Sequence, residues 1–164
     1  MALEKDVLAT PFRVAVLGPA DPTNDEGRAK RGEILQSLID IGMKAFLPEI
    51  HVVDSPAVSD TDQERIILRN PNVDFIVALD TSVGVLGELA SFQNDLEIVR
   101  KCFVMYPAEN YNPVTYTADV VWQYWMRIKY PHEEFEQCEL VSECVSRAKA
   151  LRRAKHQESP ARQF

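Results

Sequence analysis

Residues 74–80 read Asp74-Phe75-Ile76-Val77-Ala78-Leu79-Asp80, an apolar run closed at both ends by aspartate. A short run of this kind, with no polar residue at alternate positions, is typical of a strand buried on both faces in a parallel sheet. The chain then passes through Ser82 and Gly84 into a predicted helix. The apolar face of that helix is formed by Leu89, Phe92, Leu96 and Val99. A buried strand followed by an amphipathic helix is the repeating unit of α/β proteins.

The same alternation extends to both sides of this unit. Further strands are predicted over 13–17, 44–48 and 101–106, and each run ends at Gly-Pro or at proline. Helices are predicted over 34–43, with Gly42 as C-cap, and over 62–68, with Ser59 or Asp60 as N-cap. The pattern predicts an α/β fold: a Rossmann-like (flavodoxin-like) parallel sheet flanked by helices.

The C-terminal part of the chain is predicted to be helical. Apolar residues at helical spacing mark one helix over 118–128, ended by Pro131, and another over about 132–155. Residues 1–11 and 156–164 are predicted to be loose ends. We expect residues 1–164 to form one domain, with its core over about 12–130 and extra C-terminal helices.

Composition limits the function classes. The chain has 164 residues and a net charge of −7, without a basic stripe, which argues against duplex nucleic acid as a partner. A small anionic ligand remains compatible, because helix N-termini bind anions locally. No apolar stretch approaches the ~18 residues of a membrane span, and the N-terminus lacks the apolar core of a signal peptide.

Cysteine and histidine spacing predicts neither a metal site nor a redox pair. Cys138 and Cys144 are six residues apart, which matches no zinc or disulfide motif, and the histidines have no metal-ligand spacing. We therefore expect reduced thiols, a cytoplasmic protein and no metal or cofactor. Large apolar residues late in the chain predict a homo-oligomer, joined through the helix bearing Glu88 or the one bearing Trp122 and Trp125.

Two predicted strand ends carry residues suited to binding a ligand. In open α/β sheets, ligands bind beyond the carboxyl ends of the strands. The first end is Gly18-Pro19, where glycine allows close approach to the main chain, although a plain strand-to-helix turn explains it equally well. The second is 80–88, where helix-start amides and the helix dipole would hold an anion and keep Glu88 ionised. A solvated helix residue is the alternative for Glu88.

Ser82-x-Gly84-x-x-x-Glu88, together with Val16-Leu17-Gly18-Pro19, resembles the signature of the nucleoside 2-deoxyribosyltransferase-like superfamily. That superfamily includes the deoxynucleoside 5′-monophosphate N-glycosidases. The resemblance covers about residues 13–130. It implies N-glycosidic bond cleavage or deoxyribosyl transfer on a nucleoside or nucleoside 5′-monophosphate.

The resemblance also implies roles for individual residues. Glu88 corresponds to the glutamate that attacks the anomeric carbon or stabilises its positive charge. Ser82 corresponds to the residue at the sugar 5′ end, where serine tolerates a phosphate. Gly18 and Pro19 correspond to the first loop, and Gly84 to the close approach to the sugar. Asp80, which ends the strand, belongs to the same predicted substrate site.

The resemblance also implies a second carboxylate, on the helix before the central strand, that would protonate or orient the departing base. Asp62 has the best spacing and Glu64 is the second candidate, while a role as a capping or surface acid is the alternative for either residue.

The sequence departs from the family pattern in the first loop. Ala20-Asp21-Pro22 stands where many transferases have a tyrosine. The phosphate loop of the monophosphate glycosidases is missing, although Arg28, Lys30 and Arg31 follow shortly downstream. These departures leave two other functions open: a non-catalytic nucleotide sensor on the same fold, and an NAD glycohydrolase.

Overall fold

A computed structural model of the protein describes residues 2–19, 25–79, 83–107, 120, 123–124, 126–130 and 139–158. In chain order the elements are α1 (Ala2–Ala9), β1 (Arg13–Leu17), α2 (Asp25–Asp40), β2 (Lys44–Phe46), the 3-10 helix η1 (Pro48–His51), α3 (Asp60–Arg69), β3 (Phe75–Leu79), α4 (Val83–Phe92), α5 (Leu96–Val99), β4 (Cys102–Pro107), β5 (Met126–Tyr130) and α8 (Glu139–Glu158).

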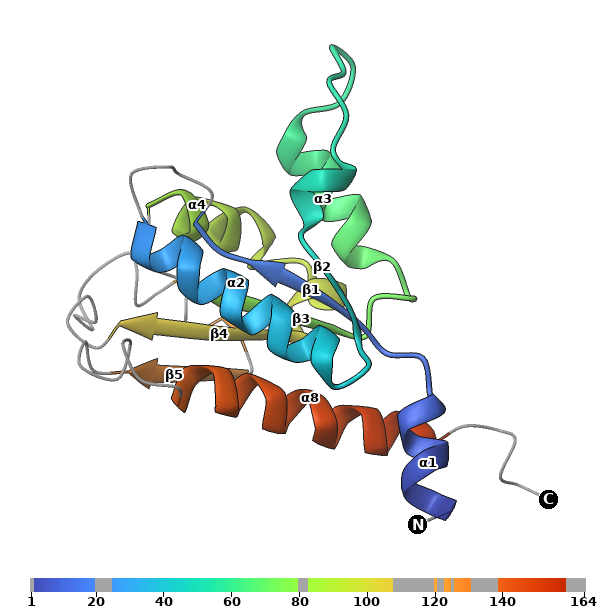
Figure 1. Cartoon of the computed structure of the whole chain (residues 1–164). Helices are drawn as coiled ribbons and strands as arrows, with labels where there is room; N and C mark the ends of the chain where they lie inside the picture. Colours follow the sequence, from blue (N-terminus) through green and yellow to red (C-terminus); the bar gives the residue numbers. More distant parts are fainter. Residues whose placement is uncertain are drawn as a thin grey trace.

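The five strands form one parallel sheet in the order β2-β1-β3-β4-β5 (Figure 1). The predicted α/β fold with a Rossmann-like parallel sheet is therefore confirmed. All five residues of the central strand β3 are buried, as its apolar run predicts. Since every strand runs the same way, their carboxyl ends share one edge of the sheet, where α2 and α4 begin.

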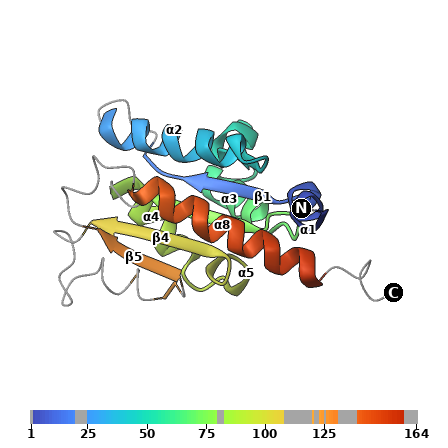
Figure 2. The same ribbon diagram turned by 60° about the horizontal axis from the view of Figure 1, so that its bottom comes forward.

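Helices cover both faces of the sheet, and alternate residues of each strand point to opposite faces. On one face, Val14, Val16, Phe75 and Val77 pack with residues of α2 and α8, such as Ile34, Leu38, Leu140 and Cys144. On the other, Ala15, Ile76 and Ala78 pack with residues of α3, α4 and α5, such as Leu68, Leu89, Phe92 and Ile98. The two helical layers are seen in Figures 1 and 2. Among the described residues, no helix has both the length and the apolar character needed to cross a membrane.

The prediction of a helix over 118–128 is wrong at its C-terminal end. Residues from Met126 to Tyr130 form β5, which pairs with β4 along its whole length. In this stretch apolar residues alternate with Arg127 and Lys129, the period-2 pattern expected of an edge strand. The helical spacing of the preceding apolar residues reaches Ile128 by coincidence. Most of the remaining predicted helix, including Trp122 and Trp125, lies outside the described residues.

The structure also revises the chain ends and the long helix after β3. Residues 2–9, predicted to be loose, form α1, and α8 continues to Glu158. The helix predicted to include both Leu89 and Val99 stops at Phe92, and α5 then starts with the Asp95 side chain accepting from the amide of Glu97. Two other predictions are confirmed: Gly42 has a φ of 79°, and Ser59 caps α3.

Candidate functional site

The predicted site residues divide between described and undescribed parts of the chain. Gly18 and Pro19 directly follow β1 and are buried, and Gly84 is the second residue of α4. Glu88 lies further along α4 and is half-buried. Asp80 and Ser82 lie outside the described residues. The structure thus brings the first-loop glycine and Glu88 to elements that meet at the carboxyl edge of the sheet.

Arg31, on α2, is the most strongly held polar side chain at this edge. Its guanidinium donates from Nε and Nη2 to the carbonyl oxygen of Val16, at 3.2 and 2.8 Å. It also donates from Nη1 and Nη2 to the two carboxylate oxygens of Glu49, at 2.5 and 2.8 Å. Such a bidentate contact is among the strongest hydrogen-bonded contacts that a carboxylate makes, and it fixes the orientation of both groups. The residue is only 6% exposed.

Gly18 is glycine because Arg31 lies against it. A Cβ atom at Gly18 would stand 2.8 Å from Cδ of Arg31 and 3.0 Å from its Cγ. These atoms belong to the middle of a side chain held at its tip by Val16 and Glu49, so they have little freedom to move away. We expected this glycine to admit a ligand to the main chain, whereas the space beside it contains the arginine stem.

Glu64, on α3, and Glu88, on α4, are two partly buried acids whose pKa values are both raised. Burial is the largest cause that raises the pKa of Glu88, to about 7, and the charge of Glu64 adds to it. Arg31 lowers the pKa of Glu88, while Glu49 raises it. The pKa of Glu64 is raised as well, first by burial and next by the charge of Glu49. Burial together with the charge of Glu64 thus favours the protonated form of Glu88 well above the usual range for a glutamate.

Asp62 occupies a different environment. Its side chain is exposed, accepts from the Ser59 hydroxyl at 2.9 Å, and pairs with Nη1 of Arg65 at 2.9 Å. It is part of the N-terminal cap of α3, and it is not among the charges that shift the pKa of Glu88. Of the two candidates for a second acid, Glu64 is therefore the one that interacts electrostatically with Glu88.

Sequence reasoning did not find the roles of Arg31 and Glu49, although one signal was present. Arg31 lies three and seven residues before Ile34 and Leu38, on the buried stripe of α2. Glu64 lies four residues before the buried Leu68 in the same way. A charged residue on an apolar stripe must find a partner or change its pKa, and both outcomes occur here. Glu49 could not be found this way, because it lies in the short 3-10 helix η1, which has no amphipathic face of its own.

The arrangement is suited to chemistry at an electron-poor carbon. It offers one carboxyl able to carry negative charge and a second able to hold a proton, next to a buried arginine. Within the part of the chain that is described, no three His, Cys, Asp or Glu side chains are grouped so that they could hold a metal ion. Residues 20–24 and 80–82, which follow β1 and β3 in the chain, lie outside the described residues.

Comparison with known proteins found no family model that matches this sequence and no similar curated protein.

Proposed function

We propose that the protein cleaves an N-glycosidic bond, or transfers a deoxyribosyl group, on a nucleoside or nucleoside 5′-monophosphate. The observation that carries the proposal is the pKa of Glu88, which burial and the charge of Glu64 raise to about 7 on a helix that begins at the carboxyl edge of the sheet. The family resemblance of residues 82–88 supports the same activity.

In this mechanism the ionised Glu88 attacks the anomeric carbon. The bond from that carbon to the base nitrogen breaks, and its electron pair leaves with the base, which takes a proton from Glu64 or from solvent. Water or an acceptor base then displaces Glu88 from the sugar. A pKa of about 7 leaves an ionised fraction of Glu88 at neutral pH to act as the nucleophile, and the raised pKa of Glu64 favours a proton on Glu64 that the base can take. Pro19, Asp80, Ser82 and Gly84 are the proposed substrate-binding residues, and Gly18 contributes by leaving room for Arg31.

The test is chromatography of the wild-type protein incubated with nucleosides, 2′-deoxynucleosides, their 5′-monophosphates and NAD, each with and without an acceptor base. Release of free base by wild type but not by Glu88→Ala supports the proposal. Release from NAD alone would identify an NAD glycohydrolase. A panel with no released base at any pH between 5 and 8 would contradict the enzymatic proposal.

A non-catalytic nucleotide sensor is the second candidate. The observation in its favour is that the first loop departs from the family pattern, with Ala20-Asp21-Pro22 where many transferases have a tyrosine. The sensor is distinguished by thermal stabilisation with a nucleotide in the complete absence of base release.

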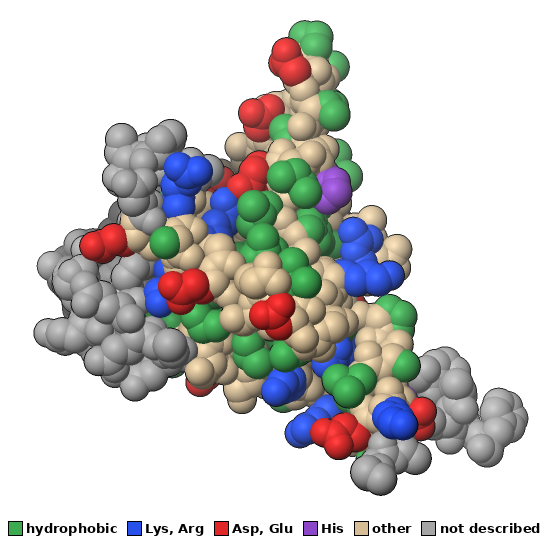
Figure 3. All heavy atoms as spheres, in the orientation of Figure 1, with side chains coloured by type: hydrophobic (Ala, Val, Ile, Leu, Met, Phe, Trp, Pro, Cys, Tyr) green, Lys and Arg blue, Asp and Glu red, His purple; other side chains and the backbone are tan. Residues whose placement is uncertain are grey.

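We also propose that the protein is a cytoplasmic homo-oligomer. The described cysteines Cys102 and Cys144 are buried thiols, in keeping with a reducing compartment. The segment from η1 through α3 projects from the body of the protein (Figure 1), and hydrophobic side chains are spread along it (Figure 3). Its exposed members are Ile50, Val53, Val58 and Ile66. An exposed apolar surface of this kind is suited to contact with a second copy of the chain.

A further inference from the structure

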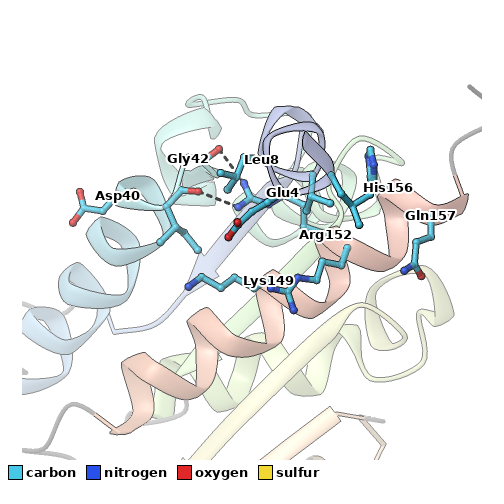
Figure 4. A pocket seen from close by; sticks show the side chains of 12 residues that line it. Glu4, Leu8, Asp40, Gly42, Lys149, Arg152, His156 and Gln157 are labelled. Atoms are coloured by element: carbon cyan, nitrogen blue, oxygen red, sulfur yellow. Dashed lines mark hydrogen bonds between the residues drawn. The ribbon is translucent and has the colours of Figure 1, made fainter. Parts of the chain in front are cut away.

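A pocket of about 840 Å³ lies between α1, the turn after α2 and the C-terminal half of α8. This is the amino edge of the sheet, opposite to the edge that carries Glu88. Figure 4 shows its walls: α1 on one side, the turn with Gly42 on another, and α8 carrying Lys149, Arg152 and His156 along the third. The volume is within the range of sites that bind a small organic molecule.

Arg152 is the buried cation of this pocket, and its hydrogen bonds are incomplete. The residue is 1% exposed. Its Nη2 donates to the carbonyl oxygen of Ile41 at 3.1 Å, and its Nη1 approaches that of Gly42 at 3.5 Å (Figure 4). Its Nε is buried without a partner, and the ion pairs of the described residues include none with Arg152. A guanidinium buried without an anion is costly, so an acceptor at this place would stabilise it.

His156 adds a second unpartnered group, one helical turn after Arg152. Its Nδ1 lies 2.8 Å from the Thr10 hydroxyl, while its Nε2 is buried with no partner. The Thr10 hydroxyl donates its proton to the carbonyl oxygen of Asp6 at 3.2 Å, so it can accept a hydrogen bond from Nδ1 of His156. An anion placed at Nε2 would then be bound by a ring that carries a proton on each nitrogen. Residues four apart on a helix lie side by side, so the two unpartnered nitrogens, Nε of Arg152 and Nε2 of His156, belong to the same part of the pocket.

The rest of the lining combines positive charge with apolar surface. Lys149 and Arg153 add two cations, against the carboxylates of Glu4 and Asp40. Leu3 and Leu8 of α1 line the pocket and remain 59% and 53% exposed. Large apolar side chains left in water beside unpartnered donors are a combination that a ligand with an anionic head and an apolar body would complete.

We propose that this pocket binds a small amphipathic oxyanion, a carboxylate or phosphate monoester with an apolar chain. Its head accepts from Arg152 and His156, and its chain lies along Leu3, Val7 and Leu8. Because Thr10 joins α1 to His156, a ligand held by His156 also stabilises the docking of α1. The rival explanation is that Arg152 only caps the C-terminus of α2, whose carbonyl groups it contacts.

The test uses the full chain labelled with ¹⁵N and titrated with sodium octanoate, octyl phosphate, inorganic phosphate and octyl glucoside, each below its micelle concentration. We expect saturable amide shifts over residues 3–8, 41–42 and 149–157, with a rise in Tm, for octanoate or octyl phosphate. A response to inorganic phosphate alone would contradict the proposal that the ligand has an apolar chain. An equal response to octyl glucoside would show an apolar cleft only and would overturn the anion site.

Variants separate the ligand site from the helix cap. His156→Ala is expected to weaken binding of the responding probe by about 10-fold or more, the effect of one hydrogen bond to a charged group. Arg152→Lys keeps the positive charge but loses the planar guanidinium with its several N–H donors, and should weaken binding to a similar extent. Arg69→Ala, on α3, is the matched control and should leave the Kd unchanged. Absence of any shift in wild type, or binding unaffected by both pocket variants, would overturn the proposal.

Discussion

The guanidinium of Arg31 faces the carboxylate of Glu49 beside the carboxyl end of β1, with two hydrogen bonds of 2.5 and 2.8 Å between them. The two residues act in opposite directions on Glu88, since Arg31 lowers its pKa and Glu49 raises it. Arg31 and Glu49 therefore set the pKa of Glu88, the proposed nucleophile, without taking part in the reaction themselves.

Glu49→Gln should move the titration of Glu88 to lower pH, because it removes a negative charge and leaves Arg31 in place. The measurement is the side-chain carboxyl resonance of Glu88, followed by ¹³C NMR from pH 4 to 9. Asp62→Asn is the control: Asp62 is not among the charges that shift Glu88, so the midpoint should not move. A midpoint that rises in Glu49→Gln would contradict this view of the site.

Gly18→Ala should destabilise the fold by about 1–3 kcal/mol, because the added methyl group overlaps the stem of Arg31. Urea denaturation measures the change. Gly32→Ala is the matched control, since nothing lies within 4 Å of a Cβ there and the residue is inside α2. It should stabilise the protein by about 0.5–1 kcal/mol through helix propensity. Equal effects of the two substitutions would contradict the contact with Arg31.

The raised pKa of Glu88 predicts how stability depends on pH. Between about pH 4.5 and 7 the folded protein holds a proton on Glu88 that the unfolded chain has released, so the free energy of unfolding falls as pH rises through this window. The expected fall is on the order of 1–3 kcal/mol, from the size of the shift. Denaturation curves of wild type and Glu88→Gln across pH 4–8 test this. In Glu88→Gln, most of the decrease in the free energy of unfolding between about pH 4.5 and 7 should disappear. If the variant and wild type show the same pH dependence, Glu88 is not the cause of the decrease.

If the protein is an N-glycosidic enzyme, Glu88→Ala should lower base release by on the order of 100-fold or more, because it removes the group that meets the developing positive charge. Glu64→Gln should also lower the rate, and should alter the alkaline limb of the pH profile, because Glu64 must be protonated to act as the acid. Asp62→Asn should retain near wild-type activity if Glu64 is the second acid. If Asp62→Asn loses activity and Glu64→Gln keeps it, Asp62 and not Glu64 is the second acid.

Self-association is testable by light scattering at tens of micromolar protein. A mass above that of one chain is expected. Ile66→Glu, on the exposed side of α3, should lower the mass if the projecting segment forms the contact. Leu96→Glu, at a comparably exposed position on α5, is the control. A monomeric wild type would contradict the oligomer.

The parts of the fold that could be predicted from sequence are those with an unambiguous local pattern. The apolar runs of β1, β3 and β4 predict buried strands because no polar residue interrupts them. In β5, Arg127 and Lys129 at alternate positions are compatible with either a helix or an edge strand, and pairing with β4 resolves the choice. Such pairing depends on residues about 20 positions away, which local periodicity does not contain.

Only part of the candidate site could be proposed from the sequence. Glu88 could be proposed as a candidate because it follows a glycine-containing turn after the central strand. The environment that sets its pKa could not, because Arg31, Glu49 and Glu64 come from three other segments and meet only in the folded chain. Which of Asp62 and Glu64 is the better candidate for the second acid depends on which side of α3 faces the protein interior. That side is set by the rotation of the helix about its axis.

The joining of α1 to α8 has a practical consequence for handling the protein. Lys155 binds both the carbonyl oxygen of Pro11 and the carboxylate of Asp74, each at 2.8 Å, so the two ends of the described chain meet at the amino edge of the sheet. An affinity tag, a surface linker or a fused reporter at residue 2 or 158 would thus project away from Glu88. Either terminus is suitable for immobilisation with the proposed catalytic edge facing solution, whereas cutting away the first ten residues would uncover the basic side of α8.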